Sequence, residues 1–387
     1  FERGLQVAYW AILKKLRFWA FSGSVIADEL RFGWMSFGQM RNFASNRSLR
    51  GPGCLVCSQA VPLIANSTYR SPWWISNPHW QTILPNVTRR RLRIRYRRER
   101  FELPDTDFVD IDWVKSGDQE SRSRCCIVIH GLEGNSQAPY VKAMARTFDR
   151  ASYAVGALNL RGCSGEPNRL KRFYHSGDTV GLAEVMNRVA ERYSEVYVVG
   201  FSLGGNVALK YFGETSSCLP KPVRAVAAFS VPCELQGGSD SLAESGNRFY
   251  MKRFARLLCS KLRDKEDLYP EFRYANSCLE MKTFYDFDGT YTAPLNGFCD
   301  AVDYWTQSSC TRSLDRIDRP ALLVNAKNDP FLSEACYPVE IARESKWLHL
   351  EIPEGGGHCG FPGKASPAGY WHELRALTFF EAARNQS

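Results

Sequence analysis

The sequence contains no apolar run long enough to cross a membrane. A membrane-spanning helix needs about 20 consecutive apolar residues, and the nearest candidate, residues 7–26, is interrupted by Lys14, Lys15 and Arg17. Paired metal ligands are also lacking, because the one C-x-x-C motif, Cys54 and Cys57, has no second pair of ligands at similar spacing. The sequence therefore predicts neither an obvious membrane-spanning helix nor a metal site.

The composition excludes wholesale disorder. The 387 residues are 44% hydrophobic, 13% aromatic and 24% charged, which are ordinary values for a globular protein. A chain of this length fits one large domain with insertions, or two domains.

The net charge of +9 is concentrated near the N-terminus. Residues 1–100 hold 17 Lys or Arg and 4 Asp or Glu, whereas the rest of the chain holds 33 basic and 37 acidic residues. The body is mildly acidic, so nucleic-acid binding is not indicated. The basic, aromatic residues 7–21 could lie on a membrane surface as an amphipathic helix, or be a tail without a role. We treat residues 1–70 as a poorly defined N-terminal extension.

Cysteine is frequent, but its 13 positions show no recurring spacing. Cys125 and Cys126, for example, lie in an apolar, strand-like run. Such cysteines are typical of buried free thiols in a reducing compartment. We therefore expect a cytoplasmic location, with peripheral membrane contact if the basic N-terminal region binds a membrane.

An antiparallel hairpin is predicted near residue 100. In residues 89–100, arginines alternate with Leu92, Ile94 and Tyr96, and a period of two indicates a strand with one solvated, basic face. Residues 108–114 also alternate and should pair with it. The basic face could bind nucleic acid or anionic lipid, but a charged edge that resists pairing with other chains is the simpler interpretation.

Short, continuous apolar runs follow, separated by helical patterns. Continuous apolar strands are buried on both faces, which is typical of a parallel sheet, and their alternation with helices indicates a doubly wound α/β fold. The runs are residues 125–130, 154–160, 196–200, 223–230, 321–326 and 347–352, and the helical stretches are residues 139–150, 178–193 and 202–212.

One interval, residues 234–317, has no clear buried strand and is rich in Phe, Tyr and Trp. More than 80 residues are too many for a loop between two strands, so we expect a mostly helical cap over one end of the sheet. Its aromatic side chains could line an apolar acyl pocket or form the core of the cap. Residues 71–233 and 318–387 would then form the two parts of the α/β core.

The motif G-x-S-x-G occurs at residues 200–204, with Ser202 at its centre. An apolar strand precedes it and a helix-compatible run follows, which is the strand–turn–helix setting of a nucleophile elbow. Glycines relieve crowding where the backbone turns sharply. We therefore predict that Ser202 is a catalytic nucleophile.

A serine hydroxyl is a weak nucleophile and needs a base, which in turn needs an acid to orient it. In this type of fold the chain order is serine, acid, histidine. His358 lies in a glycine-flanked loop after a strand, whereas His349 lies within a strand and His372 within a predicted helix. Asp329 ends the run 321–326 and precedes a proline. We predict His358 as the base and Asp329 as the acid.

The oxyanion of a tetrahedral intermediate needs two backbone N–H donors. One should be that of Leu203, directly after the nucleophile, and the other should come from a loop after an early strand. The sequence His-Gly-Leu-Glu-Gly at residues 130–134 follows such a strand, so Leu132 is the predicted second donor and His130 a residue that shapes the loop.

The sequence resembles the YheT-like branch of the α/β-hydrolase superfamily over about residues 77–380. The segments that carry this resemblance are residues 77–82 (NPHWQT), 98–105, 130–134, 161–169, 174–177, 297–298, 303–305, 328–331 and 356–361. The resemblance implies an α/β-hydrolase fold and a serine hydrolase that uses Ser202, Asp329 and His358. Characterised relatives include esterases and lipases acting on short- or medium-chain acyl esters, and some eukaryotic relatives act on glycerolipids or phospholipids. Ester hydrolysis through such a triad needs no metal or other cofactor.

Three functions are therefore considered. The first is a carboxylic-ester hydrolase acting on a small acyl ester or a lipid through an acyl-enzyme. The second passes the same acyl group to an alcohol, and the third is a non-catalytic binding protein with a hydrolase fold. For residues 161–169 and His175, a structural loop is the simpler interpretation, but contact of Arg169 with an anionic head group is an alternative.

Overall fold

The computed structural model describes residues 63–64, 66–116, 121–363 and 369–385. The predictions for the basic segment at residues 7–21 and for Cys54 and Cys57 lie outside these residues. None of the helices in the described ranges combines the length and apolar character that a membrane crossing requires.

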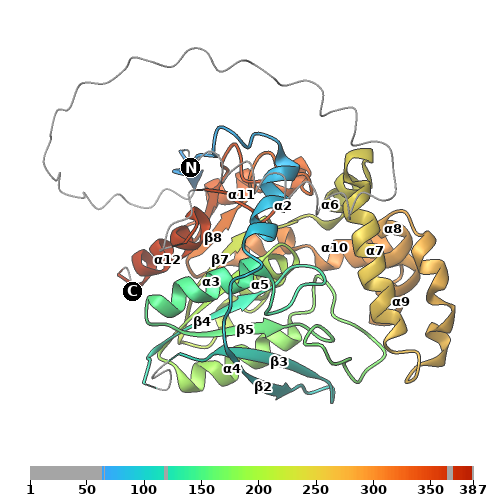
Figure 1. The fold of residues 1–387 in the computed structure, drawn as a ribbon. Coiled ribbons are helices and arrows are strands. Elements are labelled where there is room, and N and C mark those ends of the chain that lie inside the picture. The colour runs from blue at the N-terminus through green and yellow to red at the C-terminus, as the bar shows by residue number, and fades with distance from the viewer. Residues whose placement is uncertain (1–62, 65, 117–120, 364–368, 386–387) are drawn as a thin grey trace, which may run out of the picture. The chain divides into compact units, whose positions relative to one another are not determined.

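Nine strands of the described residues form one sheet, in the order β1-β9-β8-β7-β6-β4-β5-β3-β2 (Figure 1). All neighbours pair in parallel except β3, which runs antiparallel to both β2 and β5. The strands are β1 (Leu63–Ile64), β2 (Tyr96–Glu102), β3 (Phe108–Val114), β4 (Arg124–Ile129), β5 (Ala154–Asn159), β6 (Glu195–Phe201), β7 (Val223–Phe229), β8 (Ala321–Val324) and β9 (Leu348–Glu351). The predicted mostly parallel α/β sheet with an N-terminal hairpin is confirmed.

The first strand of the hairpin starts later than predicted. Strand β2 begins at Tyr96, not at residue 89. Its partner β3 ends at Val114, and beyond this point only the carbonyl of Arg95 continues the pairing, by accepting a hydrogen bond from the N–H of Lys115 at 2.8 Å. The alternating pattern of arginine and apolar residues begins before the strand does, because β3 has no residues left to pair with those before Tyr96.

Helices cover both faces of the sheet. Helices α4 (Val180–Arg192) and α5 (Leu203–Glu214) pack on one face, against side chains such as Ile127. Helices α3 (Pro139–Arg150) and α12 (Trp371–Arg384) pack on the other face, against side chains such as Val128. Successive residues of β4 thus enter different cores, which explains why its sequence is continuously apolar.

The chain between β7 and β8 is helical, as predicted. Its elements are α6 (Leu235–Ala243), η3 (Ser245–Asn247), α7 (Arg248–Arg263), η4 (Pro270–Glu280), α8 (Phe284–Phe287), η5 (Asp288–Thr292), α9 (Ala293–Asn296), α10 (Ala301–Ser308) and η6 (Cys310–Arg316). Helices α6 to α9 gather at one side of the sheet (Figure 1). Two apolar clusters stabilise this insertion, one around Trp305 and Phe284 and the other around Leu262 and Phe272.

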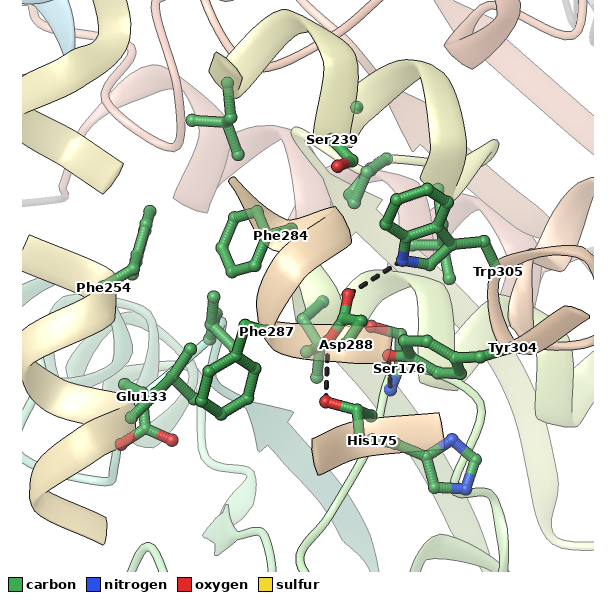
Figure 2. Close-up of a pocket in the computed structure, with 18 of the residues that line it drawn as sticks. Glu133, His175, Ser176, Ser239, Phe254, Phe284, Phe287, Asp288, Tyr304 and Trp305 are labelled. Atoms are coloured by element: carbon green, nitrogen blue, oxygen red, sulfur yellow. Dashed lines mark hydrogen bonds between the residues drawn. The ribbon is translucent and has the colours of Figure 1, made fainter. Parts of the chain in front are cut away.

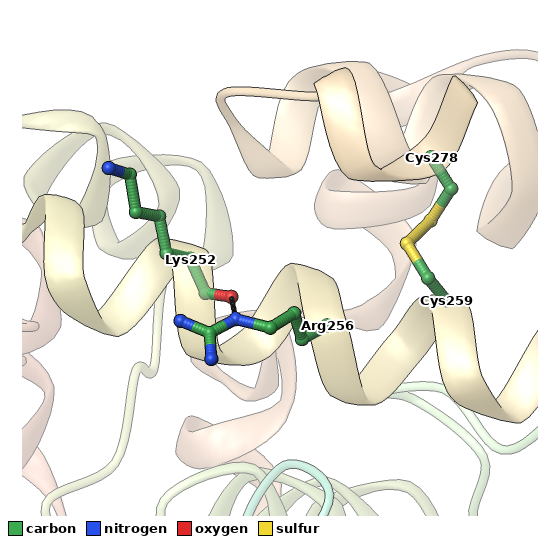
Figure 3. The surroundings of a disulfide bond; sticks show 4 residues. All are labelled: Lys252, Arg256, Cys259 and Cys278. Carbon is green, nitrogen blue, oxygen red and sulfur yellow. Dashed lines mark hydrogen bonds between the residues drawn. A yellow bond between two sulfur atoms is a disulfide. The ribbon is translucent and has the colours of Figure 1, made fainter. Parts of the chain in front are cut away.

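A disulfide links Cys259 on α7 to Cys278 on η4, with an S–S distance of 2.11 Å (Figure 3). The expectation of free thiols is therefore wrong for these two residues. They are 19 residues apart in sequence, and their Cα atoms lie 5.8 Å apart because the chain turns back between α7 and η4. Cys125 and Cys126 are buried free thiols, as predicted.

Candidate active site

Ser202 lies at the sharp turn between β6 and α5. Its backbone has φ 52° and ψ −122°, a strained combination for a residue with a side chain. A Cβ atom on Gly200 would lie 2.5 Å from the carbonyl oxygen of Gly204, and one on Gly204 would lie 2.3 Å from that of His130. The glycines of the G-x-S-x-G motif are therefore required by close packing of the turn, as predicted.

The structure brings Ser202, His358 and Asp329 together. The Oγ atom of Ser202 lies 2.9 Å from Nε2 of His358. Nδ1 of His358 lies 3.0 and 2.9 Å from the two carboxylate oxygens of Asp329. Asp329 follows β8 and His358 follows β9, so both reach the carboxyl edge of the sheet where the turn holds Ser202.

His358 is buried, and its ring stacks on Phe331 with a centroid distance of 4.1 Å. Burial by itself lowers the pKa of the imidazole, but the negative charge of Asp329 outweighs this effect and raises the pKa above its ordinary value. One carboxylate oxygen of Asp329 also accepts a hydrogen bond from the N–H of Phe331 at 2.9 Å. The arrangement therefore holds a strong base against the serine hydroxyl.

The two predicted oxyanion donors, Leu132 and Leu203, both line a cavity next to Ser202. Among the described residues, neither backbone N–H has a hydrogen-bond acceptor. His130 holds the loop before Leu132, because its ring nitrogens contact the carbonyl of Gly131 at 2.7 Å and the N–H of Leu160 at 3.1 Å. Burial lowers the pKa of His130 to about 4, so it is neutral and shapes the loop, as predicted.

Helix α2 (Pro78–Thr88) fixes the loop that carries His358, a role that the sequence analysis missed. The hydroxyl of Thr82 accepts a hydrogen bond from the N–H of His358 at 2.9 Å. The amide oxygen of Gln81 accepts one from the N–H of Gly356 at 2.7 Å and another from the side chain of Asn328 at 3.0 Å. Gln81 and Thr82 belong to the motif at residues 77–82, which thus has a physical role beside the base.

The cavity next to Ser202 has a volume of about 120 Å³ and is mainly apolar. Aromatic residues of the helical insertion that line it are Phe254, Phe284, Phe287, Tyr291, Tyr304 and Trp305. Figure 2 shows several of these rings around the carboxylate of Asp288. Other aromatic side chains, such as Phe272, lie in the second apolar cluster of the insertion. Phe284, Tyr304 and Trp305 line the cavity and also belong to the first apolar cluster of the insertion. For these residues, lining the cavity and forming the core of the insertion do not exclude each other.

A charged contact joins the insertion to the loop of Leu132. Nζ of Lys261 on α7 lies 3.0 Å from a carboxylate oxygen of Glu133. The hydroxyl of Tyr174 accepts a hydrogen bond from the N–H of Glu133 and donates one to its carboxylate, both at 2.8 Å. Glu133 has a positive φ of 52°, so these contacts hold a strained residue directly after Leu132. No local motif marks Lys261, and the sequence analysis did not find it.

Arg169 does not line the cavity. Its guanidinium is exposed and pairs with Glu102 on β2, with an Nη2–Oε1 distance of 2.9 Å. The structure therefore supports the structural interpretation of residues 161–169. His175, in contrast, does line the cavity, and burial lowers its pKa to about 4.

Comparison with known proteins agrees with this fold. A model of the α/β-hydrolase fold family matches residues 127–365. YheT of Escherichia coli (strain K12) is 32% identical over 292 residues, which cover 74% of this chain and 85% of YheT. The chain belongs to the YheT-like branch of the α/β-hydrolase family.

Two further relatives are named for reactions of esters. Phospholipase ABHD3 of Mus musculus is 26% identical over 306 residues, covering 77% of this chain and 74% of the relative. Medium-chain fatty acid ethyl ester synthase/esterase 2 of Saccharomyces cerevisiae is 24% identical over 280 residues, covering 66% of this chain and 61% of the relative. With the family match, they identify the protein as an ester hydrolase, so the non-catalytic alternative is not retained.

Proposed function

We propose that the protein cleaves carboxylic esters through an acyl-enzyme formed on Ser202. The observation that carries this proposal is the continuous contact from Ser202 through His358 to Asp329, with distances of 2.9 Å from Oγ to Nε2 and 2.9 Å from Nδ1 to the carboxylate. This is the geometry in which an imidazole can accept the hydroxyl proton while a carboxylate fixes its orientation.

The chemistry follows from these positions. His358 takes the proton of Ser202 as Oγ attacks the ester carbonyl, and Asp329 stabilises the imidazolium. The N–H groups of Leu132 and Leu203 would stabilise the oxyanion. His358 then returns the proton to the leaving alcohol, and a water molecule activated by His358 releases the acid and restores Ser202.

We further propose that the substrate is a short- to medium-chain acyl ester or a lipid. The apolar walls of the cavity, formed by residues such as Leu242, Phe254 and Phe284, favour an acyl chain beside Ser202. Residues 234–317 would form the cap that sets the chain length, on a core made of residues 71–233 and 318–387. A membrane-associated substrate could then be reached by peripheral contact of the basic N-terminal region.

The test is hydrolysis of p-nitrophenyl esters from acetate to palmitate by the wild type and by Ser202→Ala. We expect activity with an optimum of chain length in the wild type and its loss in the variant, which must retain the wild-type melting temperature. Equal hydrolysis by the two folded proteins would overturn the role of Ser202.

Acyl transfer is a second candidate, favoured by the name of the yeast relative. It differs only in the acceptor of the acyl group, because an alcohol replaces water in the second half of the reaction. Adding ethanol and measuring the ratio of ethyl ester to free acid separates the two reactions. Free acid as the main product at all ethanol concentrations would exclude the synthase.

A further inference from the structure

Among the residues that the structure describes, buried carboxylates are almost always paired with a cation. Asp107, for example, lies 3.0 Å from Arg161, and Glu351 lies 2.7 Å from Arg375. The same holds for Asp110, Asp112, Asp178 and Glu373, which pair with arginines, while Asp329 pairs with the imidazole of His358. Asp288 is the exception. It is only 8% exposed, yet no cation of the described residues pairs with its carboxylate.

Asp288 lies in the wall of the cavity that contains Ser202. It begins the π-helical turn η5, and such turns are frequent at functional sites. Its carboxylate accepts two hydrogen bonds, from Nε1 of Trp305 at 2.8 Å and from the hydroxyl of Thr292 at 2.6 Å (Figure 2). A carboxylate can accept about four hydrogen bonds, so two acceptor positions are left for another group.

The energetics of this position call for a positive partner. A buried charge without a counter-charge is costly, and burial raises the pKa of Asp288 to about 6. A cationic ligand group beside the carboxylate would lower this pKa again and favour the ionised form. Aromatic rings of Trp305, Tyr304 and Phe287 line the same part of the cavity, and the faces of such rings attract cations.

We propose that Asp288 binds a positively charged ammonium group of the substrate, while the neighbouring apolar walls contact the hydrocarbon part. This inference rests on the proposed esterase function and narrows its substrate class to esters that carry a cationic amine. Asp288 would select the substrate and take no part in the chemical step, because the base, acid and oxyanion donors are supplied by other residues.

The experiment compares two esters that differ in charge and hardly in shape, butyrylcholine and 3,3-dimethylbutyl butyrate. We expect the wild type to prefer the cationic ester by about tenfold in kcat/KM. Asp288→Asn should reduce this ratio to about one while it still hydrolyses the neutral ester. Asp267→Asn removes the same charge from an exposed part of the insertion outside the cavity wall, and it should keep the preference.

A second measurement does not depend on which part of the ester carries the charge. Choline and 3,3-dimethyl-1-butanol are compared as competitive inhibitors of p-nitrophenyl butyrate hydrolysis. Choline should bind to the wild type about tenfold more tightly than the neutral alcohol does, whereas Asp288→Asn should bind the two equally. If Asp288→Asn does not fold, Asp288→Ser replaces it in both measurements.

The outcomes separate the two proposals. A wild type without preference in both measurements, or a preference that survives in both Asp288 variants, would overturn the role of Asp288 and leave the esterase function intact. A wild type that hydrolyses none of the esters would instead contradict the proposed function.

Discussion

His358 has two contacts that determine how its activity depends on pH. Nε2 faces the hydroxyl of Ser202, and Nδ1 faces the carboxylate of Asp329. Only the neutral imidazole can accept the serine proton, so activity must rise with pH as His358 loses its own proton. Because Asp329 raises the pKa of His358, this rise should occur at higher pH than for an isolated histidine.

We therefore expect the lower limb of the pH profile of kcat/KM to have a midpoint above about 6.5, the ordinary value for histidine. Asp329→Asn should move the midpoint to lower pH and reduce kcat by a factor on the order of 10⁴, as in other serine hydrolases that lose this carboxylate. Stopped-flow or steady-state hydrolysis between pH 5 and 10 checks both effects, with thermal unfolding as the control for folding. A midpoint that is the same in wild type and Asp329→Asn would contradict the effect of Asp329 on the pKa of His358.

Single residues with a reactive side chain and a local motif were predictable from the sequence. Ser202 is surrounded by its glycines, and His358 lies in a glycine-flanked loop, so the motif itself indicates a chemical role. Asp288 has no such motif. Its distinction is the lack of a cation among its described neighbours, which depends on how helices far apart in sequence pack together and cannot be read from a local pattern.

At the scale of elements, α2 supports the base from outside the sheet. The hydroxyl of Thr82 in α2 accepts a hydrogen bond from the N–H of His358. The same hydroxyl donates a hydrogen bond to the carbonyl of Pro78 at 2.8 Å. Neither contact involves the reacting atoms, so Thr82 is a positioning residue. The sequence analysis did not predict α2, because Pro85 lies inside the helix, where proline is unusual.

Thr82→Val keeps the shape of the side chain but removes the acceptor for the N–H of His358. A buried N–H without a partner costs about 1–3 kcal/mol, and a displaced base lowers the rate of the chemical step. We expect kcat to fall by about tenfold with little change in KM. Thr82→Ser keeps the hydroxyl and should retain most of the activity, whereas equal loss in both variants would point to packing alone.

The contact between Lys261 and Glu133 connects two other elements, helix α7 and the loop of Leu132. Lys261→Met would leave the buried carboxylate of Glu133 without its cation, which costs about 3–5 kcal/mol. We expect a fall in kcat, because the N–H of Leu132, the proposed oxyanion donor, would no longer be held in place, together with a lower melting temperature.

A double-mutant cycle with Glu133→Gln distinguishes this coupling from two independent effects. If the two side chains act as a pair, the double variant should lose less than the sum of the single variants. Strictly additive losses in kcat would show that Lys261 acts through some other contact.

At the scale of the whole molecule, the sheet was the most predictable part. Strands such as β4 and β6 are buried on both faces, and this requirement leaves continuous apolar runs in the sequence. The internal structure of the helical insertion was not predictable, because most of its helices are short and its aromatic residues are divided between two cores. The order of the strands arises from long-range pairing, which a local pattern does not encode.

The disulfide gives the insertion a stability that depends on redox conditions. In the chain-entropy model, closing a loop of 19 residues stabilises the folded state by about 3 kcal/mol. We expect the variant Cys259→Ser, Cys278→Ser to unfold at a lower temperature than the wild type, and the wild type in reducing buffer to match the variant. Calorimetry in the presence and absence of reductant measures this, and equal melting temperatures of all three samples would argue against the bond.

The hydrogen bonds between α2 and the loop of His358 join an early part of the described chain to a late one. Thr82 and His358 are 276 residues apart in sequence, and Gln81 and Gly356 are 275 residues apart. Ser202 and Asp329 precede His358 by 156 and 29 residues. During synthesis, α2 therefore leaves the ribosome long before the loop of His358, the proposed base, with which it forms these hydrogen bonds. With His358 as the proposed base, hydrolytic activity requires synthesis to reach this loop, so the site is completed late in the synthesis of the chain.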